Sequence, residues 1–195
     1  MLSHVTTALR QAPGVGRALL LVLALSCACS AAAAEPAESV EAQVKAAFLP
    51  KLANFVAWPE TAFAATNSPI VIGILGDDPF GPQLDEDLKM ILVHGRPLVV
   101  RRLNELPADG LHILFLPSPE VARTREIQKS LGGKPVLTIG DAAGFAEAGG
   151  MINFTKVAGK LRFEINLEAA KSAGLQVSSR LLQVSTIVRE KGREP

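Results

Sequence analysis

The stretch that decides the fold is Ile70-Val-Ile-Gly-Ile-Leu-Gly-Asp-Asp-Pro-Phe-Gly81, in which an apolar run ends at two adjacent aspartates. An apolar run without polar alternation is typical of a strand that is buried on both faces of a sheet. Asp77 and Asp78 directly follow the expected strand Ile70–Leu75. Carboxylates at the carboxyl end of such a strand can bind a ligand, but they can also start the next helix.

Three more short apolar or β-branched runs follow, and each is closed by a turn signal. They are Pro97–Arg101, His112–Leu116 and Pro135–Ile139. The stretches Gln83–Leu92 and Pro119–Leu131 between them are polar and compatible with helices. Buried strands that alternate with helices predict an α/β fold of three layers, with a mainly parallel sheet covered by helices on both faces.

An amphipathic helix is predicted before the first strand, from Ser39 to Trp58, because its apolar residues recur at helical spacing. Ser39 is a suitable N-cap, Pro50 is expected to kink or divide the helix, and Pro59 is expected to end it. Its aromatic residues are expected in the core, with ligand stacking as the alternative; they are Phe48, Phe55 and Trp58.

The last third of the chain predicts a C-terminal β-hairpin followed by a closing helix. Gly150–Thr155 and Lys160–Leu167 are the expected strands, and the helix runs from about Ser179 to Ile187 with Ser178 or Ser179 as its cap. One side of the second strand is apolar and should face the core. The other side is either a solvated face or a partner-recognition face, and consists of Lys160, Arg162, Glu164 and Asn166.

The first 34 residues resemble a cleaved secretory signal peptide. Arg10 and Arg17 precede the short apolar run Ala18–Leu25, and Ala31–Ala34 offers small residues for cleavage. The apolar run is far shorter than the roughly 20 residues that span a bilayer. We therefore expect an exported chain without a membrane span of its own, with residues 35–195 as a single domain.

Both cysteines, Cys27 and Cys29, lie in this predicted signal segment. The mature chain would then have no cysteine, which excludes disulfides and thiol chemistry. Removing the two arginines of the segment from the 20 Lys and Arg leaves 18, against 19 Asp and Glu, a net charge of −1. A nucleic-acid-binding domain would normally carry a basic excess, so nucleic acid is not an expected partner.

The polar residues after the strands are candidates for a ligand site at the carboxyl edge of the sheet. Asp77, Asp78 and Asp141 are most simply read as helix caps, with Gly140-Asp141 preceding an expected helix 142–148. The alternative is an anion- or ligand-binding edge. In that alternative the ligand-binding residues are Asp77, Asp78, Phe80, Ser118, Asp141 and Phe145. The acidic pocket of a response-regulator receiver domain is a poor match, because no lysine follows a final strand as that site requires.

No catalytic or metal-binding motif is present in the sequence. Gly-x-Ser-x-Gly, His-Glu-x-x-His and Cys/His metal spacings are all absent, as is the Gly-x-Gly-x-x-Gly dinucleotide fingerprint. His94 and His112 are the mature histidines, and neither has an evident serine partner. The sequence therefore predicts no enzyme, no cofactor and no metal site.

The chain resembles the YfiR family over essentially its whole expected mature length, through motifs that occur in order. They are KAAFLPKLANFVAWP (45–59), GDDPFG (76–81), RPLVVRRL (96–103), HILFLPSPE (112–120), VLTIGD (136–141), GFAEAGGMINF (144–154), RFEINLEAA (162–170) and AGLQVSSRLL (173–182).

The resemblance implies a periplasmic, Rossmann-like, non-catalytic protein of a Gram-negative bacterium. Such a protein binds the periplasmic sensor domain of an inner-membrane diguanylate cyclase and represses it, which lowers cyclic di-GMP and biofilm formation. The family is also associated with homodimers. By position, Phe163–Leu167 would lie in the regulatory contact region, and the partner-binding residues are then Arg162, Glu164, Asn166 and Leu167. Redox control through disulfides is not expected, since the mature chain has no cysteine.

The sequence leaves three alternatives open. One is a periplasmic small-molecule-binding sensor that acts on another membrane signalling protein, with its ligand at the sheet edge. Another is a hydrolase with an unfamiliar site. In the third, the partner is a different sensor protein or an outer-membrane receptor.

Overall fold

A computed structural model describes residues 37–107, 109–117 and 123–190, with the side chains of 37–39 left out. The predicted signal peptide and Ser118 lie outside the described residues. The helices are α2 (Ala37–Asn54), the short 3-10 helix η1 (Glu60–Ala62), α3 (Gln83–Leu88), α4 (Thr124–Leu131), α5 (Leu167–Ser172) and α6 (Ser179–Gln183). The strands of the main sheet are β2 (Ile70–Leu75), β3 (Leu92–Val93), β4 (Arg96–Leu103), β5 (Ile113–Leu116), β6 (Leu137–Gly140), β7 (Ile152–Val157), β8 (Lys160–Asn166) and β10 (Thr186–Val188).

The main sheet is mainly parallel, as the sequence predicts. Its strand order is β10-β8-β7-β6-β5-β2-β4-β3. The pairs β4–β2, β2–β5, β5–β6 and β6–β7 are parallel. The hairpin β7–β8 and the short pair β3–β4 are antiparallel. A second, two-stranded sheet pairs β1 (Val56–Ala57) with β9 (Gln176–Val177).

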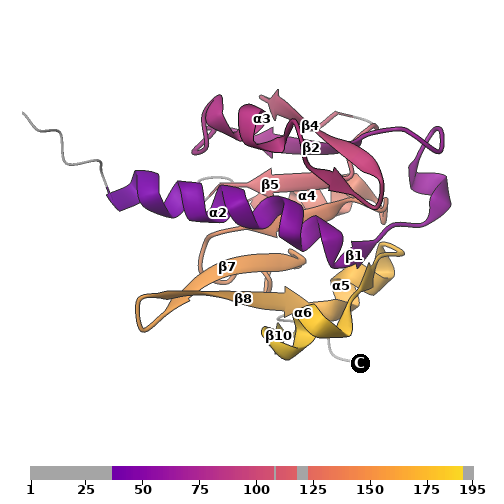
Figure 1. Cartoon of the computed structure of the whole chain (residues 1–195). Helices are drawn as coiled ribbons and strands as arrows, with labels where there is room; N and C mark the ends of the chain where they lie inside the picture. Colours follow the sequence, from indigo (N-terminus) through magenta and orange to yellow (C-terminus); the bar gives the residue numbers. More distant parts are fainter. Residues whose placement is uncertain (1–36, 108, 118–122, 191–195) are drawn as a thin grey trace, which may run out of the picture. The chain divides into compact units, whose positions relative to one another are not determined.

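Helices cover both faces of the sheet, which makes three layers (Figure 1). On one face, Leu49 and Leu52 of α2 are fully buried in a core that includes Ile72 of β2. On the other face, Ile127 and Leu131 of α4 belong to a second core with β5. A fully buried strand side chain contributes about 1.5–3 kcal/mol, so these two cores hold the layers together without disulfides. The described part of the chain forms the three-layer Rossmann-like fold.

The structure corrects both ends of the predicted first helix. Helix α2 includes Ala37, so Ser39 lies inside its first turn rather than at the N-cap. The helix continues through Pro50 but ends at Asn54, before Trp58. It ends early because Val56 and the next residue pair with β9, and tertiary pairing outweighs the helical pattern of the sequence.

Two predicted C-terminal helices are also corrected. The closing helix stops at Gln183, and the β-branched run Thr186–Val188 forms β10, which pairs in parallel with β8. Ser178 is confirmed as the cap of α6, since its Oγ accepts a hydrogen bond from the Arg180 N–H at 3.3 Å. Residues 142–148 form consecutive turns rather than a helix. Among the described residues, no helix has the length and apolar character needed to cross a bilayer.

Candidate functional site

The adjacent aspartates at the carboxyl end of β2 close a loop and do not cap a helix. Asp78 Oδ1 accepts a hydrogen bond from the Phe80 N–H at 2.8 Å, while Asp78 Oδ2 lies 2.7 Å from Arg102 Nε. Helix α3 begins only after Pro82, so the predicted capping role of the Asp-Asp pair is wrong. The residues after Asp78 form a tight turn that is stabilised from β4 by Arg102.

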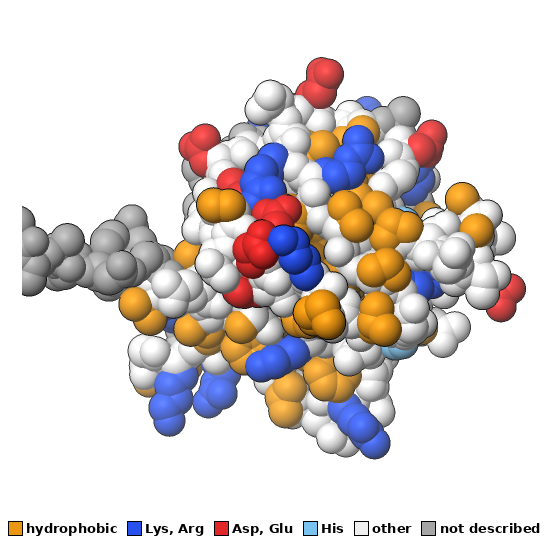
Figure 2. All heavy atoms as spheres, turned by 45° about the horizontal axis from the view of Figure 1, so that its top comes forward, with side chains coloured by type: hydrophobic (Ala, Val, Ile, Leu, Met, Phe, Trp, Pro, Cys, Tyr) orange, Lys and Arg blue, Asp and Glu red, His pale blue; other side chains and the backbone are white. Residues whose placement is uncertain are grey.

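Arg102 joins this loop to the next helix. Its second terminal nitrogen lies 2.6 Å from Asp85 Oδ2 and 2.7 Å from the Gly81 carbonyl oxygen. The hydrogen bond from Arg102 lowers the pKa of Asp85. Figure 2 shows acidic and basic side chains intermixed on this side of the molecule rather than a field of one sign. Asp77 is exposed beside this cluster, while Asp78 is half-buried within it.

The third aspartate of the predicted edge belongs to a different ion-pair chain. Asp141, at the end of β6, accepts from Lys45 Nζ of α2 at 2.7 Å, and Lys45 also lies 2.8 Å from Glu41. Glu41 in turn pairs with Lys156 of β7. Lys45 is only 9% exposed. Burial lowers the pKa of Lys45, but the hydrogen bonds to Asp141 and Glu41 outweigh burial, so the net pKa is raised. Lys45 is therefore charged, and its ion pairs connect α2 to the sheet.

The aromatic candidates of the same edge are packed inside the protein. Phe80 is half-buried and its ring centroid lies 4.8 Å from that of Phe115. Phe145 is fully buried because its ring fills the space above Gly140 and Gly150, where an added Cβ would come within 2.6 Å and 2.1 Å of it. The described residues of the predicted edge therefore fall into two ion-pair clusters and a packed core, and Ser118 lies outside the described residues.

The hairpin carries polar side chains on one side of β8. Arg162 is exposed and Glu164 is half-buried on β8, and Asn153 Nδ2 of β7 donates to Glu164 Oε2 at 2.9 Å. This bond fixes one oxygen of the Glu164 carboxylate. Asn153 Oδ1 is buried and has no hydrogen-bond partner in the described part of the chain. Such a group is normally satisfied by an ordered water or by a bound group.

Two other members of the predicted partner face are partly or fully covered. Asn166 is 1% exposed, contrary to its predicted position on a solvated row, because its Oδ1 caps α5 and its Nδ2 donates to the Ala146 carbonyl. Leu167 is half-buried at the first position of α5. The strand β8 is also not an edge, since β10 pairs with it and places Thr186 opposite Glu164.

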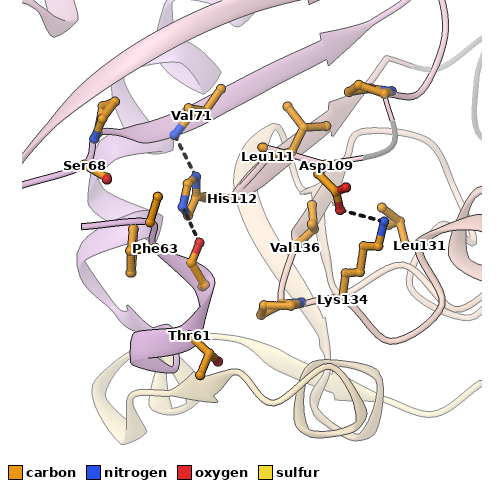
Figure 3. A pocket seen from close by; sticks show the side chains of 16 residues that line it. Thr61, Phe63, Ser68, Val71, Asp109, Leu111, His112, Leu131, Lys134 and Val136 are labelled. Atoms are coloured by element: carbon orange, nitrogen blue, oxygen red, sulfur yellow. Dashed lines mark hydrogen bonds and ion pairs between the residues drawn. The ribbon is translucent and has the colours of Figure 1, made fainter. Parts of the chain in front are cut away.

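A feature that the sequence reasoning missed is a cavity at the amino-terminal edge of the sheet (Figure 3). Its volume is about 500 Å³. The walls come from residues of three separate segments, which are 61–71 before and within β2, 107 and 109–112 before β5, and 131–136 before β6. No sequence motif marks these segments, because the pocket is formed by apolar side chains that only the tertiary fold brings together. We call this cavity the amino-edge pocket.

His112 closes the inner wall of the amino-edge pocket. Its Nδ1 accepts a hydrogen bond from the Val71 N–H at 3.1 Å, and its Nε2 donates to the Ala62 carbonyl, also at 3.1 Å. The ring stacks on Phe63, with centroids 4.5 Å apart. Burial lowers the pKa of His112, so the ring is neutral at pH 7 and serves as a structural link. The other candidate histidine, His94, is exposed, and its Nε2 lies 3.0 Å from the Val56 carbonyl oxygen.

Within the described residues, no group of three or more His, Cys, Asp or Glu side chains has an arrangement that could hold a metal ion. Comparison with known families gives one result for this chain. The sequence profile described as YfiR/HmsC-like matches residues 42–186, which is about three quarters of the chain. The search of curated proteins gave no match. The chain belongs to the YfiR/HmsC-like family.

Proposed function

We propose that this member of the YfiR/HmsC-like family is an exported, non-catalytic regulator that represses an inner-membrane diguanylate cyclase by binding its periplasmic sensor domain. The observation that carries the proposal is the family match over residues 42–186. Repression would lower cyclic di-GMP and biofilm formation. The regulator would act in the periplasm after loss of its signal peptide, and it would form a homodimer.

The hairpin supports the proposal because it carries a carboxylate that is already oriented for contact with a partner. The carboxylate of Glu164 is held by Asn153 at 2.9 Å and is still half-exposed, while Arg162 is exposed two residues away on the same strand. A carboxylate that is already oriented loses less conformational entropy when it pairs with a cation of a partner. We therefore assign Glu164 and Arg162 to the partner contact, with Asn166 and Leu167 supporting the end of β8 from beneath.

Repression requires a difference in affinity between two states of the cyclase. A regulator that binds both states equally cannot shift the equilibrium between them, however tightly it binds. The hairpin face, which consists of Arg162 and Glu164 of β8, would therefore bind the inactive arrangement of the sensor domain more tightly than the active one. A tenfold difference in affinity corresponds to about 1.4 kcal/mol, which one well-placed charged contact can supply.

The test is cellular cyclic di-GMP in a strain that lacks this protein, with exported copies restored. Deletion should raise cyclic di-GMP, and the wild-type copy should reverse the rise. Glu164→Lys should fail to complement because it reverses the charge of the proposed contact and removes the acceptor of Asn153. Glu164→Gln keeps an oxygen acceptor for Asn153 and removes only the charge, so it should complement partially.

The matched control is Glu105→Lys, which makes the same charge reversal at an exposed glutamate after β4. It should complement fully. No change in cyclic di-GMP on deletion would contradict the cyclase as the target. Full complementation by Glu164→Lys would instead contradict the hairpin as the contact, while leaving repression intact.

A further inference from the structure

We propose that the amino-edge pocket binds a small amphiphilic monocarboxylate, with its apolar body inside the cavity and its carboxylate at the rim. This site lies at the edge of the sheet opposite to the carboxyl edge where the sequence places possible ligand-binding residues. The inference goes beyond the proposed function, because repression through the hairpin requires no small ligand. The size of about 500 Å³ falls within the range of typical small-molecule pockets.

The walls of the pocket fit an apolar ligand body. The lining side chains are mostly aliphatic, aromatic or proline, and they are contributed by elements that are packed into the two cores. The apolar wall consists of Phe63, Pro69, Val71, Leu111, Leu131 and Val136. Each Å² of apolar ligand surface that leaves water contributes roughly 25 cal/mol, so burial in this cavity supplies the main driving force.

The inner wall presents few hydrogen-bonding groups to a polar ligand atom. His112 is the main polar side chain there, and both its ring nitrogens are already used by the backbone of Val71 and Ala62. Ser68 Oγ accepts a hydrogen bond from the Ala65 N–H at 3.0 Å. A polar ligand atom that is buried without a partner costs about 1–3 kcal/mol, so the part of the ligand that enters should be apolar.

The rim carries more positive than negative charge. Lys134 Nζ lies 2.9 Å from Asp109 Oδ1, and this pair is solvent-exposed, with the Asp109 side chain 83% exposed. Arg101 Nη1 lies 3.7 Å from the position that a Cβ of Gly110 would occupy, and Arg96 lies over the Phe63 ring at 3.7 Å. Arg101 and Arg96 do not line the cavity but lie beside its lining residues Gly110 and Phe63, and Arg96 Nη1 also donates to the Ala65 and Ser68 carbonyls. Three cations and one carboxylate therefore lie at or near the rim. Because an exposed ion pair contributes only about 0–1 kcal/mol, a ligand carboxylate can share Lys134 with Asp109 at small cost.

Trp58 provides a built-in reporter for this site. It is the only tryptophan of a chain that has no tyrosine, and its Nε1 donates to the His112 carbonyl at 3.2 Å. Intrinsic fluorescence excited at long wavelength therefore comes from Trp58, which does not line the amino-edge pocket itself but is hydrogen-bonded to its lining residue His112. A ligand that touches His112 or Phe63 should change this emission.

The experiment is a titration of the mature chain with decanoate, followed by Trp58 fluorescence and by the thermal unfolding midpoint. We expect a saturable change in emission below the micelle concentration and a midpoint that rises with decanoate concentration. Decanol and decyltrimethylammonium carry the same apolar body with a neutral or a cationic head. Both should bind at least about threefold more weakly than decanoate.

Variants locate the site. Lys134→Met should weaken decanoate binding by about two- to fivefold, the effect of one exposed charge contact. Lys129→Met is the matched control, because Lys129 is an exposed lysine of α4 that does not line the amino-edge pocket. Val71→Phe should abolish binding by filling the cavity, and Ala64→Phe does so from the exposed rim in case Val71→Phe does not fold.

Three results would overturn the proposal. The first is the absence of saturable decanoate binding to the wild-type chain. The second is equal binding of decanoate, decanol and the ammonium compound, which would remove the carboxylate preference. The third is unchanged binding in a folded filling variant, which would place the ligand elsewhere. None of these results depends on cyclic di-GMP, so the failure of this inference and the failure of the proposed function are distinguishable.

Discussion

The two edges of the central sheet differ in how their space is filled. At the carboxyl edge, Asp78 and Asp141 are engaged by cations from other elements, and Phe145 fills the gap left by two glycines. At the amino edge, the ion pair of Lys134 and Asp109 stays at the exposed rim, and a cavity of about 500 Å³ stays open. Carboxylates after strands therefore do not by themselves locate a binding site. The packing of the loops decides which edge is closed and which is open.

The largest effect is expected where the carboxyl edge is most tightly packed. Gly150→Ala would place a Cβ 2.1 Å from the Phe145 ring, so the ring or the backbone must move. We expect a loss of about 3 kcal/mol in the free energy of unfolding, measured by urea denaturation. The double variant Phe145→Leu/Gly150→Ala should recover part of this loss, because the smaller side chain makes room. Strictly additive losses would show that Phe145 does not close this edge.

A somewhat smaller effect is expected from the ion-pair chain that joins α2 to β6. Lys45→Met leaves Asp141 and Glu41 without their shared cation, and the Lys45 and Asp141 side chains are each only 11% exposed. We expect a loss of about 2 kcal/mol, measured by urea denaturation. The control Lys89→Met removes an ion pair to Glu86 in which both side chains are more than 60% exposed, and should cost less than about 0.5 kcal/mol. Equal costs for the two lysines would contradict the structural role of Lys45.

The smallest effect is expected for the exposed cluster around Arg102. Its side chain is 40% exposed, so Arg102→Met should cost less than about 1 kcal/mol, and added salt should reduce the difference from wild type. The pKa of Asp85 is lowered by Arg102, so this contribution is present above the usual carboxyl pKa and is lost as the pH falls through the lowered value. The unfolding curves of the wild type and Arg102→Met should therefore differ at neutral pH and converge at acidic pH. A difference that persists in acid would assign the effect of Arg102 to packing rather than charge.

Much of the fold could be predicted from the sequence, because uninterrupted apolar runs are a strong signal. Strand Ile70–Leu75 has the predicted bounds, and the hairpin and the parallel sheet are also confirmed. The predicted helix 142–148 fails because Phe145 has to reach between Gly140 and Gly150, and Gly144 has a φ of +80° that a helix does not allow.

The rest could not be predicted, because it depends on contacts between distant segments. The run Thr186–Val188 continues an apolar helical pattern, but pairing with β8 decides its structure. Asn166 alternates with the inward-facing residues of β8, yet the 142–149 turns cover it through the Ala146 carbonyl. The amino-edge pocket combines segments such as 61–71 and 131–136, which are far apart in the sequence and carry no polar motif.

Binding of the hairpin face to a cyclase sensor domain is best tested by isothermal titration of the mature chain into the purified periplasmic domain of that cyclase. We expect saturable binding that Glu164→Gln weakens by about tenfold, the effect of a charged contact of about 1.4 kcal/mol, and that Glu105→Lys leaves unchanged. Absence of binding by the folded wild-type chain, or equal affinity of wild type and Glu164→Gln, would contradict this expectation.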